Sequence, residues 1–218
     1  LYMLTHATYK SAMFFAAGNF EEQTGSSRLD KLVGIARSMP KSGIAFLLAA
    51  IAAISLPPTG GFMAKELIFE GTLESRHILV LVFLALGAIL NVAVFSKVVF
   101  ILWARGNGSK RDAKGACAFP ALILGILALI GGFFFMRADR LVSGIVGAHE
   151  PGLISNVWHF SFLTVVSLAI YTLGFLMYAK SRSGDKSAVE SFEPLRTSPA
   201  LGPALRMAEQ KMFDPYEI

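Results

Sequence analysis

The feature that most constrains this chain is an apolar stretch that is interrupted by helix-breaking residues and then carries a charge. Residues 43–56 are almost wholly apolar, and Lys65 follows them after an interruption. The interruption consists of two prolines and two glycines: Pro57, Pro58, Gly60 and Gly61. A charge inside a bilayer is costly and marks a functional site, and a helix broken at membrane depth survives only where protein buries it or where it lines a wet cavity. Together the two features predict an ion pathway through a membrane protein.

The composition assigns the chain to the membrane proteins. Apolar residues make up 54% of the 218 residues and charged residues only 16%. The net charge of +5 does not indicate nucleic-acid binding, because the basic residues lie in short loops between apolar segments. The single Cys117 excludes an internal disulfide. The chain opens directly in an apolar helix without a basic flank, so we expect residue 1 to lie inside a larger subunit or in one piece of a split subunit.

Five apolar segments are each near or above the roughly 20 residues that a helix needs to span the hydrocarbon core. They cover residues 1–20, 42–71, 78–104, 118–136 and 157–179, and the second contains the break. The sequence therefore predicts an all-α integral membrane protein with about five transmembrane helices, one of them discontinuous. At the start of the fifth segment, Trp158 and His159 are typical of an interfacial anchor.

The basic residues alternate between loops and predict the orientation. The loop of residues 21–41, the loop of residues 105–116 and the tail after residue 179 hold four, four and six Lys or Arg. The two remaining loops hold one and two. Because cytoplasmic loops carry an excess of Lys and Arg, the three richer segments are predicted to be cytoplasmic, in a multi-pass protein of the inner (plasma) membrane.

The tail is predicted to contain a polar connector and then an amphipathic helix. From residue 199 onward apolar side chains recur at helical spacing, at Leu201, Leu205, Ala208 and Met212. Such a helix lies on the membrane surface or against a partner subunit. A loose chain end is the alternative.

Three side chains form the predicted proton relay. His6 and Lys10 are four residues apart and therefore share one face of the first segment, and Lys65 lies at the break in the second. A low-dielectric site disfavours the charged ammonium, so a lysine there can release a proton near neutral pH, and histidine can relay protons in either direction. In the competing interpretation, Lys10 snorkels to the interface and His6 is a satisfied core residue. Lys10 is poorly placed to snorkel, because it lies in the middle of its segment.

Two further charged residues are candidates for the pathway. Glu66 follows Lys65 directly, and it either pairs with a lysine or a neighbouring subunit or marks the exit of the helix to water. Lys97 lies within the third segment, and it either belongs to the pathway or snorkels towards the cytoplasmic end. The sequence has no cysteine cluster, no histidine pair spaced for haem and no phosphate loop, so no metal, cofactor or catalytic centre is expected in this chain.

Two blocks of residues carry a resemblance to a known family. Residues 5–18 read Thr-His-Ala-Thr-Tyr-Lys-Ser-Ala-Met-Phe-Phe-Ala-Ala-Gly, and residues 56–66 read Leu-Pro-Pro-Thr-Gly-Gly-Phe-Met-Ala-Lys-Glu. They are similar to the T/N-H-A-x-x-K-x-x-x-F-x-x-x-G signature and the L-P-P-x-x-G-F-x-x-K broken helix of the antiporter-like subunits. Over residues 1–106 the chain thus resembles the family shared by respiratory complex I, Mrp-type Na+/H+ antiporters and membrane-bound hydrogenases. Tyr9 departs from the commoner Phe of that family, and Ala64 from Ser or Thr.

The resemblance implies a division of the chain and a role for each relay residue. It implies that residues 1–106 end the second of two inverted five-helix repeats, that residues 107–179 add transmembrane helices, and that residues 180–218 form the cytoplasmic connector and surface helix. By the same resemblance Lys65 is the terminal lysine of a proton channel, and Lys10 and His6 form its central relay. The implied partners are other membrane subunits of the same complex, including the N-terminal half of the antiporter-like unit, whose first half-channel is not in this chain.

We therefore expect a proton-translocating membrane subunit of a multisubunit complex, surrounded by lipid, with Na+/H+ antiport as an open variant. The alternative is a non-transporting scaffold subunit of a redox complex. A quinone-reducing enzyme is a weaker rival, because the sequence shows neither a quinone pocket nor a redox centre. Membership in complex I, in an Mrp antiporter or in a hydrogenase is left open, although the last residues, 213–218, favour the latter two.

Overall fold

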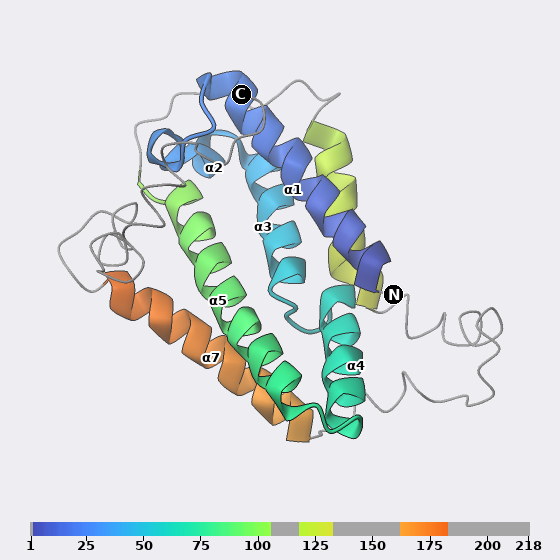
Figure 1. The fold of residues 1–218 in the computed structure, drawn as a ribbon. Helices are drawn as coiled ribbons and strands as arrows, with labels where there is room; N and C mark the ends of the chain where they lie inside the picture. The colour runs from blue at the N-terminus through green and yellow to red at the C-terminus, as the bar shows by residue number, and fades with distance from the viewer. Residues whose placement is uncertain (1, 106–117, 133–161, 183–218) are drawn as a thin grey trace, which may run out of the picture. The chain divides into compact units, whose positions relative to one another are not determined.

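The computed structural model describes residues 2–105, 118–132 and 162–182, and all regular structure in these ranges is helical (Figure 1). The all-α class predicted from the sequence is therefore confirmed for this part of the chain. Residues 1–178 form one compact unit and residues 179–218 another. The predicted helix of the tail, Cys117 and the Trp158–His159 anchor lie outside the described residues.

The helices follow the predicted apolar segments with shifted ends. They are α1 (Tyr2–Thr24), the short 3-10 helix η1 (Leu29–Leu32), α2 (Ile35–Ser38), α3 (Pro40–Ala53), α4 (Gly60–Glu74), α5 (Ile78–Leu102), a helix over Ala118–Gly132 and α7 (Phe162–Arg182). The loop predicted over residues 21–41 is thus partly helical, because α1 continues to Thr24 and two short helices follow it.

Among the described helices, α5 alone is long and apolar enough to cross a membrane. Pro40–Ala53, Ala118–Gly132 and Val165–Ala179 are apolar but shorter, so the count of five spans stays a prediction. Large apolar side chains cover the first half of α5, where Ile78 and Leu79 are each 71% exposed and Phe83 is 65% exposed. Leaving such surface in water costs about 25 cal/mol per Å², so this half of α5 suits a lipid or protein environment.

The core lies between α1 and α3 and is built largely from alanines. Ala12 and Ala16 of α1 and Ala45 and Ala49 of α3 are completely buried in one apolar cluster. Small side chains let helix backbones approach closely, which is how membrane helices pack without a hydrophobic driving force between them. A buried hydrogen bond links the same pair of helices, since Asn19 Nδ2 donates to Ser42 Oγ at 3.1 Å.

Two of the basic loops meet at one end of the helices. Arg37 Nε donates to the Trp103 carbonyl oxygen at 2.8 Å, and the Gly34 amide donates to the Ile101 carbonyl oxygen at 3.0 Å. Gly34 has a φ of 78°, which a glycine adopts without strain. The loop of residues 21–41 and the start of the loop at residue 105 therefore share an end of the bundle, as the alternation of charges requires. The side of the membrane that this end faces stays a prediction.

The predicted break in the second segment is present, but it begins earlier than the prolines. Helix α3 ends at Ala53, and α4 begins only at Gly60. Ser55 has a φ of 62°, in the left-handed region, so the chain has already left the helix two residues before Pro57. The Thr59 side chain then caps α4, because its Oγ1 accepts a hydrogen bond from the Phe62 amide at 3.2 Å. The apolar segment as a whole runs from Pro40 to Glu74 rather than over residues 42–71.

Candidate functional site

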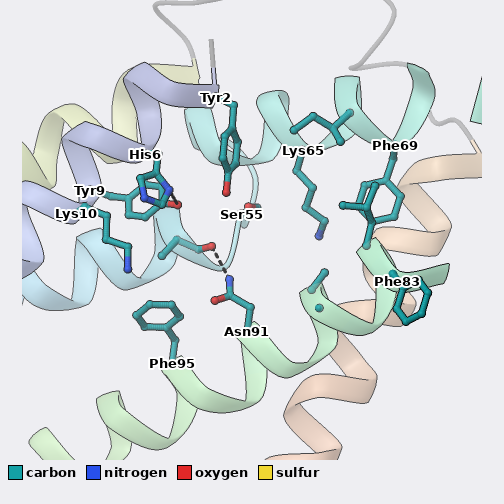
Figure 2. A pocket seen from close by; sticks show the side chains of 15 residues that line it. Tyr2, His6, Tyr9, Lys10, Ser55, Lys65, Phe69, Phe83, Asn91 and Phe95 are labelled. Atoms are coloured by element: carbon teal, nitrogen blue, oxygen red, sulfur yellow. Dashed lines mark hydrogen bonds between the residues drawn. The ribbon is translucent and has the colours of Figure 1, made fainter. Parts of the chain in front are cut away.

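A cavity of about 480 Å³ lies between α1, α4 and α5 beside the helix break. Its polar lining comes from seven residues: Tyr2, His6, Tyr9, Lys10, Ser55, Lys65 and Asn91. The three residues of the predicted relay thus line one cavity, although more than fifty residues of chain separate Lys10 from Lys65. Figure 2 shows Lys10 and Lys65 pointing into the cavity from α1 and α4, towards α5. The volume is sufficient for several water molecules, each of which takes about 30 Å³ in the liquid.

Lys65 is nearly enclosed by aromatic groups. Its side chain is only 9% exposed, and its Nζ lies 4.5 Å from the centre of the Tyr171 ring and 5.7 Å from the centre of the Phe69 ring. The same Nζ lies 3.5 Å from the Tyr171 hydroxyl. Within the described ranges Lys65 makes no salt bridge with a carboxylate. Ring faces and a hydroxyl therefore contact the ammonium directly, and the Glu66 carboxylate is the nearby opposite charge on α4.

On α1, His6 and Lys10 have a less enclosed environment. Both side chains are half-buried. The hydroxyl of Tyr9 lies 2.8 Å from His6 Nδ1, and the Tyr9 and Tyr2 rings flank the imidazole, with centroids 5.1 and 5.7 Å away. If the Tyr9 hydroxyl donates to Nδ1, Nε2 carries the proton of a neutral His6. Lys10 makes no salt bridge with a carboxylate of the described residues.

Later helices contact the backbone of the break at three carbonyl groups. Asn91 of α5 donates from Nδ2 to the Ala53 oxygen at 2.8 Å, and the Tyr171 hydroxyl of α7 donates to the Ser55 oxygen. Gly132, at the end of the Ala118–Gly132 helix, packs on the Pro58 oxygen so closely that a β-carbon there would overlap it. The carbonyl end of α3 is thus buried against protein on these sides and faces the cavity at Ala53 and Ser55. Protein burial of this kind is what a broken helix requires in a membrane.

Glu66 points away from the cavity. It is 4% exposed and is absent from the cavity lining. Its carboxylate accepts a hydrogen bond from the Ser167 hydroxyl of α7. Of the alternatives left open by the sequence, exit to water therefore does not describe this side chain, and its place on a proton pathway stays a prediction.

Lys97 also lies outside the cavity. It is half-buried on α5, two residues beyond Phe95, which does line the cavity. Successive helical residues rotate by about 100°, so Lys97 and Phe95 face different directions. The structure brings together His6, Lys10 and Lys65, and it leaves Glu66 and Lys97 at other positions.

Sequence reasoning missed Asn91, Ser167 and Tyr171. Asn91 had a detectable signal, because it is an amide in the otherwise apolar stretch of residues 78–95. Ser167 and Tyr171 carried a weaker signal, since hydroxyls are common in membrane helices. Their i, i+4 spacing gives a shared face but does not name the helix that this face contacts.

The fold and the cavity define a class of protein: a helical membrane protein with a discontinuous helix and two lysines on one cavity. Residues 1–91 match the family model described as "NADH:quinone oxidoreductase/Mrp antiporter, TM". The chain belongs to this antiporter-like subunit family, which confirms the resemblance carried by residues 5–18 and 56–66, and it is a membrane protein.

Relatives come from three kinds of complex. NADH-quinone oxidoreductase subunit N of Desulforudis audaxviator is 30% identical over 162 residues, which are 67% of this chain and 32% of the relative. One Na(+)/H(+) antiporter subunit of Alkalihalophilus pseudofirmus is 22% identical over 214 residues, covering 86% of this chain and 27% of the relative. Formate hydrogenlyase subunit 3 of Escherichia coli is 31% identical over 138 residues, covering 59% and 23%. The chain thus spans about a quarter to a third of the length of these relatives.

Proposed function

We propose that this chain is part of a proton-translocating membrane subunit and that His6, Lys10 and Lys65 relay the protons. The observation that carries the proposal is the shared cavity, because it places two lysines and a histidine from separate segments around one volume that can hold water. Lys65 is buried and His6 and Lys10 are half-buried, and ionisable groups away from water are costly in a membrane. Ionisable residues that are kept in a membrane despite this cost are typical of proton relays.

The broken helix places a partial negative charge beside the positively charged side chains of the cavity. The carbonyl end of α3 carries a partial negative charge, and Ala53 and Ser55 line the cavity at this end. A transported proton or cation is therefore favoured beside the break. Two ammonium groups on one cavity repel each other, and the repulsion is stronger where the effective dielectric is below that of water, so simultaneous charging of both lysines is disfavoured. Charging one lysine can thus displace the proton of the other.

The relatives support the proposed setting. Their names include subunits of an NADH-quinone oxidoreductase, of a Na(+)/H(+) antiporter and of formate hydrogenlyase. We propose that this chain likewise works beside other membrane subunits of one complex and that Na+/H+ antiport is an open variant of its activity. Its predicted place in the inner membrane, with basic loops and tail in the cytoplasm, belongs to the same proposal.

The decisive experiment compares Lys65→Ala with wild type in proteoliposomes that hold the assembled complex, with proton and sodium flux measured separately. We expect flux to fall below roughly a tenth of the wild-type value, since a positioned proton-transfer group contributes about a hundredfold or more. A native gel verifies assembly. Wild-type flux in an intact Lys65→Ala complex would replace the proposal with the scaffold function.

A further inference from the structure

Helix α7 presents a face of regularly spaced buried residues to the rest of the chain. Ser167, Ile170, Gly174 and Tyr178 are buried, and Tyr171 is half-buried beside them. The spacing of three or four residues places them on one side of the helix. Apart from Thr172, the exposed side chains between Val165 and Ala179 of α7, among them Leu168, Leu173 and Leu176, are apolar. The hydroxyls of Ser167 and Tyr171 are therefore on the face that packs against protein.

These hydroxyls contact two consecutive residues of α4, Lys65 and Glu66. Ser167 donates to the Glu66 carboxylate, and Tyr171 lies against Lys65 with its ring and its hydroxyl. Tyr171 also donates to the Ser55 carbonyl oxygen in the break. One side chain of α7 thus contacts both the buried ammonium and the backbone of the interruption that precedes it.

The close approach of α7 to α5 determines where Tyr171 lies relative to Lys65. A β-carbon at Gly174 would lie 2.6 Å from Val92 Cβ and 2.7 Å from the Ile89 carbonyl oxygen. The glycine therefore lets the two helices approach more closely than any other residue would allow. Since Gly174 is one turn from Tyr171, this contact holds the tyrosine at the depth of Lys65.

We propose that Tyr171 is the positioning residue of Lys65. Its ring holds the ammonium at the edge of the cavity, and its hydroxyl fixes the ring to Ser55 in the helix break. The four-carbon stem of a lysine is flexible, so without such a contact the ammonium can adopt other positions. The role rests on the proposed function of Lys65 as a proton carrier. It extends the functional site to a residue far beyond the segment 1–91 that matches the family model.

The other titratable groups around Lys65 are known within the described ranges. Glu66 neighbours it on α4, Glu70 follows one turn after Glu66, and the second ring over the ammonium, Phe69, does not titrate. Across the cavity, α1 contributes Tyr2, His6, Tyr9 and Lys10, and the cavity-lining residues of α5 include no titratable group. A change in the pH dependence of flux in a Tyr171 variant, with all these groups retained, therefore reports on the contact between Tyr171 and Lys65.

The test uses the assembled complex in proteoliposomes and three variants on one helix. Tyr171→Leu removes both ring and hydroxyl, and we expect flux to fall roughly tenfold. Tyr171→Phe keeps the ring and removes the hydrogen bonds of the hydroxyl, and we expect a fall of roughly threefold. The matched control is Thr172→Val, because Thr172 is exposed and, among the described residues, its hydroxyl bonds only to the Leu168 carbonyl oxygen of its own helix. We expect wild-type flux in this control.

The pH at half-maximal flux separates positioning from packing. We expect it to be displaced in Tyr171→Leu and unchanged in Thr172→Val. Wild-type flux and an unchanged profile in both Tyr171 variants would overturn the proposal. So would wild-type flux in Tyr171→Phe beside a reduced flux with an unchanged pH profile in Tyr171→Leu, since the ring would then only fill space. If Tyr171→Leu does not assemble, Tyr171→Phe decides alone, because it keeps the volume of the side chain.

Lys65→Ala in the same series separates this proposal from the one on which it rests. Full flux in Lys65→Ala contradicts the proton-carrier role itself, whatever the Tyr171 variants do. An inactive Lys65→Ala together with wild-type Tyr171 variants contradicts only the positioning role.

Discussion

Lys10 and Lys65 line the same cavity but come from two different kinds of helix. Lys10 lies in the middle of α1, a continuous helix of 23 residues, and its side chain is half-buried. Lys65 lies in the second turn of α4, just after a break, and is 9% exposed between two aromatic rings. At the break, backbone carbonyls of Ala53 and Ser55 accept hydrogen bonds from side chains of later helices, whereas the continuous helix pairs its carbonyls internally.

The difference suggests a division of labour between the two sides of the cavity. On the α1 side the polar neighbours of the lysine are side chains: His6, Tyr2 and Tyr9. On the α4 side they include main-chain atoms at Ala53 and Ser55, which cannot be exchanged by substitution. We infer that substitutions on the α1 side adjust the relay, while changes in the packing of the break remove it.

The largest effect is expected from a substitution that adds an atom at the close contact between α4 and the end of α3. A β-carbon at Gly61 would overlap the Ala52 carbonyl oxygen, and a backbone oxygen cannot turn aside. We expect Gly61→Ala to abolish assembly of the complex, because overpacking against backbone costs about 1–3 kcal/mol or more. The readout is the amount of assembled complex on a native gel.

The matched control for Gly61 lies on the same helix. A β-carbon at Gly71 would meet nothing within 4 Å, and alanine is favoured over glycine in a helix by about 1 kcal/mol. Gly71→Ala should assemble as wild type does. Equal assembly of the two variants would show that the close contact between α3 and α4 is dispensable.

An intermediate effect is expected from the lysine on the continuous helix. Lys10→Ala should lower proton flux roughly tenfold and leave assembly intact, because its half-buried side chain makes no salt bridge with a described carboxylate. Lys97→Ala serves as the comparison, since Lys97 is outside the cavity, and we expect a smaller loss. A larger loss in Lys97→Ala than in Lys10→Ala would move the pathway to α5.

The smallest loss of flux is expected when the hydrogen-bond partner of His6 is removed. Tyr9→Phe removes the hydroxyl that lies 2.8 Å from His6 Nδ1 and keeps the ring. A single hydrogen bond has a net worth of about 1 kcal/mol, so flux should fall by roughly two- to fivefold. His6→Ala measured in parallel sets the scale. If Tyr9→Phe reduces flux as much as His6→Ala does, the tyrosine is itself part of the relay.

The sequence predicted the parts of the site that depend on local pattern. The helical spacing of His6 and Lys10 and the helix breakers before Lys65 are short-range features, and the structure has the corresponding helices and break. The family signature added the expectation that the two blocks work together, and both line one cavity. Those residues nevertheless remain predicted pathway residues until flux is measured.

The parts that the sequence did not predict depend on packing between distant segments. The break begins at Ser55, whose left-handed backbone no proline or glycine announces. Tyr171 is 106 residues from Lys65 and 116 from Ser55, and a residue's spacing on its own helix does not name the helix that it will contact. Glu66 was similarly ambiguous, because only the position of Ser167 shows which way its carboxylate points.

The carbonyl groups of the break have a consequence for how the chain is assembled in the membrane. Ala53 receives its hydrogen bond from Asn91, 38 residues later, and Ser55 receives one from Tyr171, 116 residues later. During translation, both halves of the broken helix are therefore synthesised well before their hydrogen-bond partners Asn91 and Tyr171. Until α5 and then α7 arrive, the break needs water or another protein at these oxygens. Biogenesis should thus be ordered from α1 to α7, with the lysine site completed last.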